Sequence, residues 1–313
     1  QDYPRFEVIA VDDNSTDATP RILRSLAEAF PGLTHIEGAP LPQGWYGKLF
    51  ALHQACRQAR GSFLLFTDAD PVFQPQALSS AMFYMKECDL DVLTLMPGSR
   101  FGSFWEKTVQ PVVFAFIAAL TRFKKVNSPD YPDAMGIGAF ILIKRSVYER
   151  IGGHERVKQK IVEDIELAKC AKREGFKLAI ADGKAIFSIR MYYSLKEIWQ
   201  GWNKNIFVAL KKSVPRTLGY MFAILSFQVA SYVVLFYNVW GGSSVWLTLL
   251  SLAGAGLVLV TGRQLCVELQ LNPRNALLFP LGAVAMAAIM VNSMIQVLCK
   301  GRVEWRDRTY FNS

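Results

Sequence analysis

Charge is distributed unevenly along this chain. Residues 217–299 hold three long apolar stretches, at about 217–239, 243–261 and 276–298, and almost no charge, whereas most charged residues lie in 1–216. A helix of about 20 apolar residues spans the roughly 30 Å hydrocarbon core of a bilayer, so each stretch is long enough to cross one. The pattern predicts a water-exposed front part followed by a transmembrane region.

The net charge of +9 raises the question of nucleic-acid binding. Many basic residues flank the apolar region, a placement that suits an anionic lipid surface better than a phosphate backbone. We therefore expect a membrane partner and no nucleic acid. The flanking residues are Lys196, Lys204, Lys211, Lys212 and Arg216 before the region and Lys300, Arg302, Arg306 and Arg308 after it.

The cysteines and histidines argue against disulfides and against a zinc site. The five cysteines form no C-x-x-C pair, and the three histidines are far apart in the sequence. We expect reduced cysteines in a cytoplasmic protein. We expect no signal peptide, and because the sequence opens with Gln1 rather than Met we expect a trimmed form.

Short apolar runs alternate with helical patterns in the front part. Residues 6–11 and 63–67 indicate strands, and residues up to 30 and 49–59 indicate helices. Buried-type strands alternating with helices predict an α/β fold with a mainly parallel sheet. Further strands are expected at 92–95, 139–143, 177–181 and 185–189, and a further helix at 162–174.

Two segments point toward a membrane surface. The apolar run 109–120 contains Pro111 and is too short to span, so we expect a buried or interfacial helix. Ser194 and Glu197 have capping-box spacing. The helix that they begin mixes lysines with apolar residues, which predicts an interfacial amphipathic helix over 194–216. Its apolar residues include Trp199, Trp202, Ile206 and Phe207.

Acidic residues follow two of the expected strands. Asp12 and Asp13 stand where ligands bind in open α/β sheets, although Asp also favours turns and helix caps. Asp68 and Asp70 are two residues apart and suit a divalent cation such as Mg²⁺ or Mn²⁺; a polar exit from the strand is the alternative.

Glu163 and Asp164 form a third acidic motif at the start of a helix. A carboxylate there can act as a general base. Acidic residues are also favoured at helix starts on electrostatic grounds, and taken alone that explanation is the stronger one.

In their order and spacing, these three motifs resemble family 2 inverting glycosyltransferases of the GT-A fold, over about residues 5–215. Gly47-Lys48 resembles the Gly-Lys segment of that family's donor site. The resemblance implies that Asp12 and Asp13 contact the nucleotide, that Asp68 and Asp70 hold metal and diphosphate, and that Asp164 is the base. It also implies a first strand ahead of residue 1, so part of the nucleotide pocket is expected to be missing.

A membrane subgroup that glycosylates lipids, including hopanoid-associated and carotenoid glycosyltransferases, is more closely similar. Processive polysaccharide synthases carry a Gln-x-x-Arg-Trp motif. In this chain Gln200 is followed by Gly201, Trp202, Asn203 and Lys204, so the motif is absent, which argues against a polymer synthase. The shared motifs are Gly44-Trp45-x-Gly47-Lys48, Met135-Gly136-x-Gly138-Ala139-Phe140, Arg190-Met191-Tyr192 and Trp305-Arg306-x-Arg308-x-Tyr310.

The expected organisation is a GT-A-like catalytic domain at 1–193, an interfacial helix at 194–216, a transmembrane region at 217–299 and a basic tail at 300–313. We expect a multi-pass protein of the inner cell membrane with its catalytic domain and tail in the cytoplasm. This topology requires either that one apolar segment is re-entrant or that the hairpin around Gly241-Gly242 does not cross.

The expected reaction moves a sugar from a nucleotide-sugar donor, a UDP-sugar first, to a lipid acceptor such as a hopanoid, carotenoid or sphingolipid. Lys48 is expected near the phosphates, and Glu163, Trp202 and Lys204 near the acceptor or the phosphates. Two alternatives remain open: a polyprenyl-phosphate glycosyltransferase, and a non-catalytic lipid-binding protein that retained the fold. In the first, Arg100, Arg190 or Lys204 would bind the acceptor phosphate.

Overall fold

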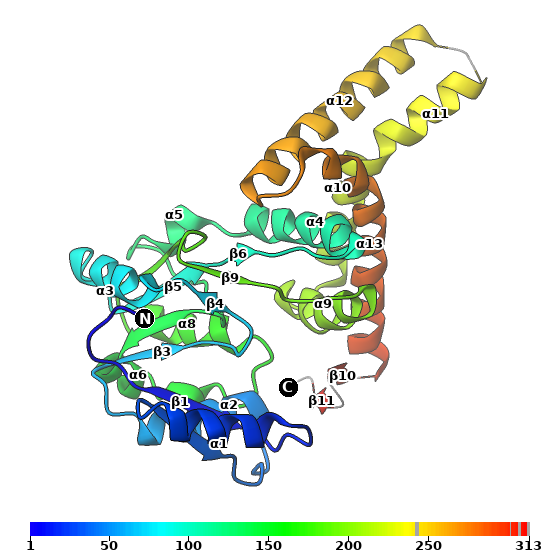
Figure 1. Ribbon diagram of the computed structural model, residues 1–313. Coiled ribbons are helices and arrows are strands. Elements are labelled where there is room, and N and C mark those ends of the chain that lie inside the picture. Colours follow the sequence, from blue (N-terminus) through cyan, green and yellow to red (C-terminus); the bar gives the residue numbers. More distant parts are fainter. Residues whose placement is uncertain (242–243, 301, 306–307, 312–313) are drawn as a thin grey trace. The chain divides into compact units, whose positions relative to one another are not determined.

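The computed structural model describes residues 1–241, 244–300, 302–305 and 308–311, with side chains up to residue 299. The chain forms two compact units (Figure 1). Unit 1 comprises residues 1–98 and 121–189, and unit 2 comprises residues 99–120 and those from 190 onward. The segment 99–120 thus leaves the first unit and packs in the second.

Unit 1 is built on a four-stranded sheet with the strand order β3 (Phe63–Phe66), β7 (Ile141–Lys144), β5 (Val92–Met96) and β8 (Leu178–Asp182). β5 and β8 are parallel, and β7 is antiparallel to both β3 and β5. Three strands therefore share one direction. The predicted α/β class is confirmed, with β7 as the strand that makes the sheet mixed.

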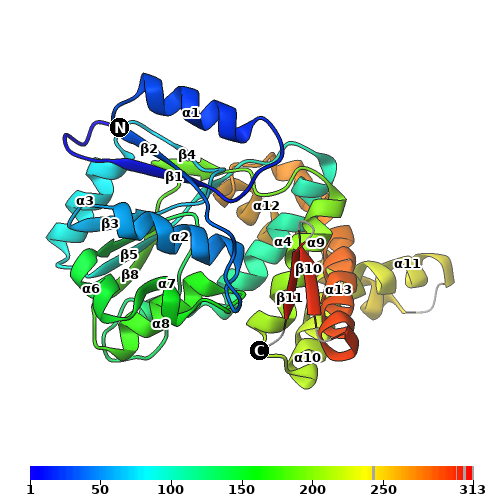
Figure 2. The ribbon, with the colours of Figure 1, turned by 90° about the horizontal axis from the view of Figure 1, so that it is seen from below.

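A second sheet pairs β1 (Val8–Asp12) in parallel with β2 (Leu33–Glu37). The helices α1 (Thr19–Ala29) and α2 (Gly47–Gln58) flank this pair on opposite sides (Figure 2). Pro20 lies in the first turn of α1, as its sequence position predicts. β2 was not predicted from the sequence, because only Leu33 and Ile36 of its five residues are apolar.

The remaining elements of unit 1 complete the packing around the sheets. The main core joins the sheet to α8 (Glu163–Arg173) through Ile143, Leu167 and Ala171, which are almost fully buried. The other elements are β4 (Val72–Phe73), α3 (Ala77–Glu87), β6 (Gly98–Ser99) at the unit boundary, α5 (Phe123–Val126), α6 (Arg145–Arg150), α7 (Gly153–Arg156) and β9 (Phe187–Ile189).

Unit 2 is organised around α4 (Phe104–Leu120), α9 (Leu195–Ala209) and α13 (Phe279–Ile295). Val109 and Val113 of α4 are fully buried, while Leu120 at its end is 37% exposed. The expected helix at 109–120 is therefore part of a longer helix, α4, which is buried around Val109 and Val113 and becomes exposed toward Leu120. Gly282 of α13 lets the two helices approach closely, because a Cβ there would lie 2.0 Å from the Thr108 carbonyl oxygen.

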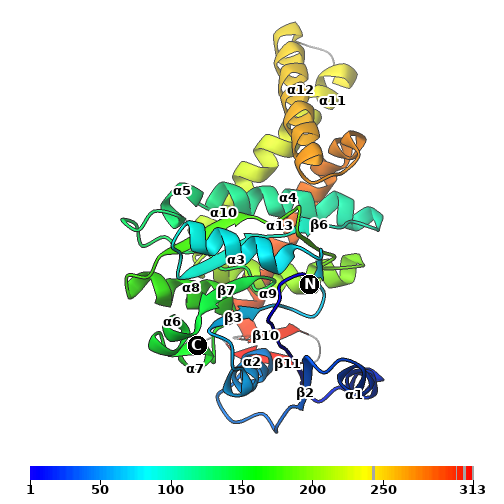
Figure 3. The same ribbon diagram turned by 60° about the vertical axis from the view of Figure 1, so that its left-hand side comes forward.

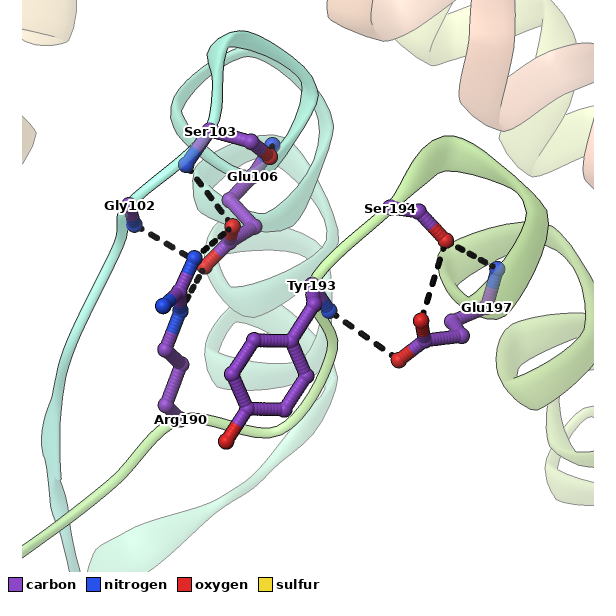
Figure 4. Close-up of polar contacts among 7 residues, drawn as sticks. All are labelled: Gly102, Ser103, Glu106, Arg190, Tyr193, Ser194 and Glu197. Atoms are coloured by element: carbon purple, nitrogen blue, oxygen red, sulfur yellow. Dashed lines mark hydrogen bonds and ion pairs between the residues drawn. The ribbon is translucent and has the colours of Figure 1, made fainter.

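The capping box predicted for α9 is confirmed. The Glu197 N–H donates to Ser194 Oγ (3.3 Å), and the Tyr193 N–H donates to Glu197 Oε2 (3.1 Å; Figure 4). Ile198, Trp202 and Phe207 are buried within unit 2. Much of the apolar face that the sequence assigns to a membrane surface is therefore covered by protein, and the placement of 194–216 at a membrane stays a prediction.

A polar network joins α9 to α13. The Asn203 amide donates to Gln296 Oε1 (2.6 Å), and the Asn292 amide donates to Asn203 Oδ1 (3.1 Å). The Ser293 hydroxyl donates to the Asn203 carbonyl. Because these groups satisfy one another, an apolar helix carries polar residues without leaving them unpaired.

Three helical segments are long and apolar enough to cross a membrane: Val214–Gly241, Val245–Glu268 and Pro273–Cys299. They correspond to the stretches predicted from the sequence. α11 and α12 form an antiparallel hairpin (Figure 3). Residues 242 and 243 of its expected turn lie outside the described residues. The component elements are α10 (Val214–Leu225), the π-helical η1 (Ser226–Ala230), α11 (Ser231–Gly241), α12 (Val245–Glu268), the 3₁₀ helix η2 (Pro273–Leu278), α13 and the π-helical η3 (Gln296–Lys300).

The predicted basic tail at 300–313 contains an antiparallel hairpin of β10 (Arg302–Trp305) and β11 (Arg308–Phe311). Arg306, part of the expected tail motif, lies outside the described residues, so the side of the membrane that this tail occupies stays a prediction.

A second capping box, which the sequence analysis missed, begins α4. The Ser103 N–H donates to Glu106 Oε1 (2.7 Å), and the Glu106 N–H donates to Ser103 Oγ (3.3 Å). Arg190 donates two hydrogen bonds to the same carboxylate, from Nε to Oε2 (3.0 Å) and from Nη2 to Oε1 (2.9 Å; Figure 4). Burial acts to raise the pKa of Glu106, but Arg190 and the backbone N–H groups of Gly102 and Ser103 lower it to about 2.

We expect Glu106→Gln to destabilise unit 2 by about 1–3 kcal/mol, because it removes charge from hydrogen bonds that a fully buried group makes. Because the pKa of Glu106 is lower in the folded chain, its ionised carboxylate stabilises the folded state at pH values above its ordinary pKa of 4.5. This contribution is lost as the pH falls toward 2. Thermal unfolding of the full chain in detergent measures both effects. Glu37→Gln, which breaks an exposed pair with Arg24, is the control; equal shifts for the two variants would refute the prediction.

Candidate active site

Lys48 links two acidic segments of unit 1. Its Nζ lies 2.7 Å from Asp68 Oδ1 and 2.7 Å from Glu163 Oε1. The lysine stands in the first turn of α2, Asp68 follows β3, and Glu163 begins α8. Burial acts to lower the pKa of Lys48, but the negative charges of Glu163 and Asp68 raise it above its ordinary value. The lysine is therefore an ammonium ion held between two carboxylates.

Asp164 is held by backbone N–H groups. Its Oδ2 accepts from Gly138 (3.0 Å), and its Oδ1 accepts from Ile165 (2.8 Å). Burial and the neighbouring charge of Glu163 raise the pKa of Asp164 to about 6, although Lys48 and these hydrogen bonds act to lower it. A carboxylate with such a pKa is mostly ionised at neutral pH and accepts a proton more readily than an ordinary Asp.

The charged groups meet at Gly138. A Cβ at this position would lie 3.1 Å from Lys48 Nζ, 3.5 Å from Asp164 Oδ2 and 3.6 Å from Asp68 Oδ2. The glycine therefore leaves open a small space that all three groups border. The pocket here is lined by Lys48, Leu52, Phe66, Thr67, Gly138, Ile141, His154, Glu163 and Asp164.

Two threonine hydroxyls, one of them buried, hold the loop that contains Gly138. The Ile137 N–H donates to Thr94 Oγ1 (2.9 Å), which lies 2.9 Å from the Phe140 carbonyl oxygen. The Thr67 hydroxyl lies 3.0 Å from the Ala139 carbonyl oxygen. Contacts from β5 and from the end of β3 thus position the backbone that donates to Asp164.

His154 belongs to the pocket lining, although the sequence analysis set the histidines aside. The Tyr148 hydroxyl lies 2.8 Å from His154 Nδ1, and the His154 backbone N–H donates to the same hydroxyl (3.0 Å). Burial, with the positive charge of Lys48, lowers the pKa of His154 to about 3, so the ring is neutral. The one sequence signal for this residue is its position directly after Gly152-Gly153 and ahead of the Glu-Asp pair.

The structure brings together four of the predicted site residues: Lys48, Asp68, Glu163 and Asp164. Asp12 is buried at the carboxyl end of β1, where its Oδ1 accepts from the Ser15 N–H (3.2 Å). Asp13 follows it, and Asp70 is exposed beyond β3. The nucleotide role of Asp12 and Asp13 and the metal role of Asp70 stay predictions.

Trp202 and Lys204 lie on α9 in unit 2. Trp202 is buried, with edge-on ring contacts to Phe114 and Tyr192 (6.1 Å between centroids in each case). Its indole thus has an evident packing role. The predicted role of either residue at an acceptor is not tested by these contacts.

Residues 1–152 match the family described as glycosyl transferase family 2. The chain contains a family 2 glycosyltransferase domain. This confirms the resemblance drawn from the acidic motifs, and the matched range includes Lys48, Asp68 and Gly138 of the site. Glu163 and Asp164 lie beyond it, and they join the family 2 domain through the contacts of Lys48 and Gly138.

Curated relatives of this chain include 4,4'-diaponeurosporenoate glycosyltransferases. The protein from Staphylococcus aureus strain USA300 is 22% identical over 216 residues, which cover 68% of this chain and 56% of that protein. The protein from Staphylococcus haemolyticus is 22% identical over 221 residues, covering 70% and 58%. The chain thus spans little more than half the length of the curated relatives that it matches.

Solved structures with some similarity include Staphylococcus aureus TarS (residues 1–349) in complex with UDP, with a TM-score of 0.41, 16% identity and coverage of 100% of this chain and 89% of that one. Another is glucosyl-3-phosphoglycerate synthase from Mycobacterium tuberculosis in complex with Mn²⁺, UDP-glucose and phosphoglyceric acid, with a TM-score of 0.38, 17% identity and coverage of 61% and 63%.

Proposed function

We propose that this protein is a membrane-bound inverting glycosyltransferase that transfers a sugar from a nucleotide-sugar donor to a lipid acceptor. The first candidate donor is a UDP-hexose. The observation that carries the proposal is the meeting of an ammonium ion, an Asp-x-Asp carboxylate and a carboxylate of raised pKa at Gly138 in a family 2 domain. A basic group, a ligand for a cation and a proton acceptor are what a displacement at a sugar diphosphate requires.

In the proposed mechanism, Asp164 accepts the proton when the acceptor group is a hydroxyl, whereas an acceptor carboxylic acid is already ionised at neutral pH and attacks as its carboxylate. The acceptor oxygen attacks the anomeric carbon, and the bond from that carbon to the diphosphate oxygen breaks with inversion. The backbone N–H groups of Gly138 and Ile165 orient Asp164. Lys48 supplies positive charge near the diphosphate, and Glu163 keeps this lysine charged.

The donor set suits Mg²⁺ or Mn²⁺. Within the described residues, no group of three or more His, Cys, Asp and Glu side chains is arranged to hold a metal. Three carboxylates nevertheless face one ammonium ion, so negative charge is in excess. Asp68 and Asp70 would hold such an ion together with the donor phosphates, a common arrangement for Mg²⁺. When bound, the ion neutralises charge on the leaving diphosphate.

A lipid acceptor is supported by the apolar helices and by the relatives. The three candidate spans expose large apolar side chains, including Phe222, Trp240 and Trp246. Relatives at 22% identity are named for glycosylating a carotenoid acid. We propose a carotenoid first, with hopanoids and sphingolipids as alternatives, and a catalytic domain on the cytoplasmic side of the inner membrane.

The polyprenyl-phosphate alternative needs a basic group for the acceptor phosphate. Arg190 was one candidate, but its guanidinium is already paired with Glu106 through two hydrogen bonds. Binding a phosphate there would take the guanidinium from the Glu106 carboxylate, which is fully buried, and leave that charge without its partner, which is costly. This disfavours Arg190 as the phosphate-binding residue, whereas Arg100 and Lys204 stay candidates for it, and a lipid hydroxyl or acid is our first proposal for the acceptor.

A donor screen with the full chain in detergent tests the proposal. We expect UDP release from one UDP-sugar in the presence of a lipid acceptor and Mg²⁺ or Mn²⁺, and loss of that release in excess EDTA, because the shared ion offsets diphosphate charge. Full activity in EDTA would remove the metal from the proposal. Absence of turnover and of binding with every nucleotide-sugar would favour the lipid-binding alternative.

A further inference from the structure

The position of Lys48 bears on how the metal enters. Asp68 is the Asp-x-Asp carboxylate that borders the shared space, yet its Oδ1 already contacts the Lys48 ammonium at 2.7 Å. Glu163 holds the same ammonium from the other side at 2.7 Å. A side-chain cation thus occupies the coordination region of Asp68 before any ligand is present.

The lysine and a metal ion cannot both occupy this place. The Gly138 backbone closes one side, and a point only one Cβ away from it already lies 3.1 Å from Nζ. A metal ion placed on Asp68 Oδ1, which Nζ contacts at 2.7 Å, would lie against the ammonium ion, and two cations that close repel each other strongly in a partly buried site. A metal on Asp68 therefore requires the ammonium ion to move.

The lysine is able to move. Its side chain is 43% exposed, as is 37% of the Asp68 side chain, whereas only 12% of Glu163 is exposed. The side chains on both sides of the Lys48–Asp68 contact therefore reach solvent. A diphosphate brings new negative charge, which attracts the ammonium and compensates for the contact that it gives up.

We propose that Lys48 holds the cation position on Asp68 in the resting enzyme and yields it to a divalent metal only when a nucleoside diphosphate binds. This inference rests on the proposed function and adds an order of events to it. Without metal, the lysine offsets part of the negative charge of the acidic site. The donor's diphosphate then attracts the lysine and supplies the remaining ligands of the metal.

The test measures Mn²⁺ binding to the full chain in detergent without nucleotide. Binding is read from the decrease in the electron paramagnetic resonance signal of free Mn²⁺. We expect Lys48→Met to bind Mn²⁺ about tenfold or more tightly than the unaltered chain, the equivalent of one charge-assisted hydrogen bond. Asp68→Asn added to Lys48→Met should abolish the gain. Lys144→Met removes a lysine paired with Asp91 elsewhere in unit 1 and should leave Mn²⁺ binding unchanged.

Thermal unfolding identifies a misfolded variant. If Lys48→Met does not fold, Lys48→Gln keeps a hydrogen-bond donor and makes the same comparison. Unchanged or weaker Mn²⁺ binding in a folded Lys48 variant overturns the inference, as does an equal gain in Lys144→Met. Calorimetric binding of UDP with Mn²⁺ to the unaltered chain separates the two proposals: binding there without a Lys48 effect refutes this inference alone, whereas absence of binding refutes the proposed function.

Discussion

Asp164→Asn is expected to lower turnover by about 10²–10⁴-fold while donor binding survives, because the amide keeps the shape of the side chain but cannot accept a proton. The measurement is sugar transfer by the full chain in detergent, together with calorimetric binding of UDP and metal. Near-normal turnover with a hydroxyl acceptor would refute this role of Asp164. Near-normal turnover only with a lipid phosphate or carboxylate, which are already ionised, would favour an acceptor that needs no base.

The matched control is Glu166→Gln on the same helix, where Glu166 pairs with Lys169 at 2.6 Å. It removes one acidic charge from α8 and should leave turnover within about twofold, because the pair is a local surface interaction. The pH profile gives an independent check. Since the pKa of Asp164 is raised to about 6, turnover of the unaltered chain should fall as the pH drops below that value and the base becomes protonated.

Gly136→Ala is expected to have the second large effect. A Cβ at Gly136 would lie 2.2 Å from the Asp164 carbonyl oxygen and 2.6 Å from its carbonyl carbon, so the start of α8 must shift. Overpacking of this kind costs about 1–3 kcal/mol. Displacement of a catalytic group by about 1 Å can cost 10²-fold in rate. Thermal unfolding and sugar transfer measure the two losses.

Gly32→Ala is the control for that substitution. Its added Cβ meets nothing within 4 Å, so stability and turnover should stay close to those of the unaltered chain. If Gly136→Ala behaves like Gly32→Ala, the close packing of the Gly136 loop against Asp164 does not position the base.

The strongly patterned parts of the fold were predictable from the sequence. Uninterrupted apolar runs gave β3 and the three candidate spans, and capping chemistry gave the start of α9. β2 and α3 were missed. In β2, His35 and Glu37 interrupt the apolar pattern. The apolar face of α9 was given to a membrane, because a sequence does not show that α13 covers it.

For the site, the residue types were predictable but their contacts were not. Asp68 and Glu163 are 95 positions apart, and nothing in the spacing indicates that one lysine joins them. His154 was missed because a lone histidine carries no pattern, and its pocket position depends on the tight turn at Gly152-Gly153 and on Tyr148. The raised pKa of Asp164 likewise arises from burial and from Glu163, which only the folded chain provides.

The reaction proposed for this site is the transfer of one sugar to a lipid by a single displacement with inversion. The most direct measurement offers the full chain a radiolabelled UDP-sugar, Mg²⁺ and mixed micelles of a carotenoid acid or hopanoid alcohol, beside soluble oligosaccharides, and determines the product and its anomeric configuration. We expect one sugar per lipid, with the anomeric configuration of the donor inverted. Repeated addition to soluble oligosaccharides, or a lipid product with retained configuration, would contradict it.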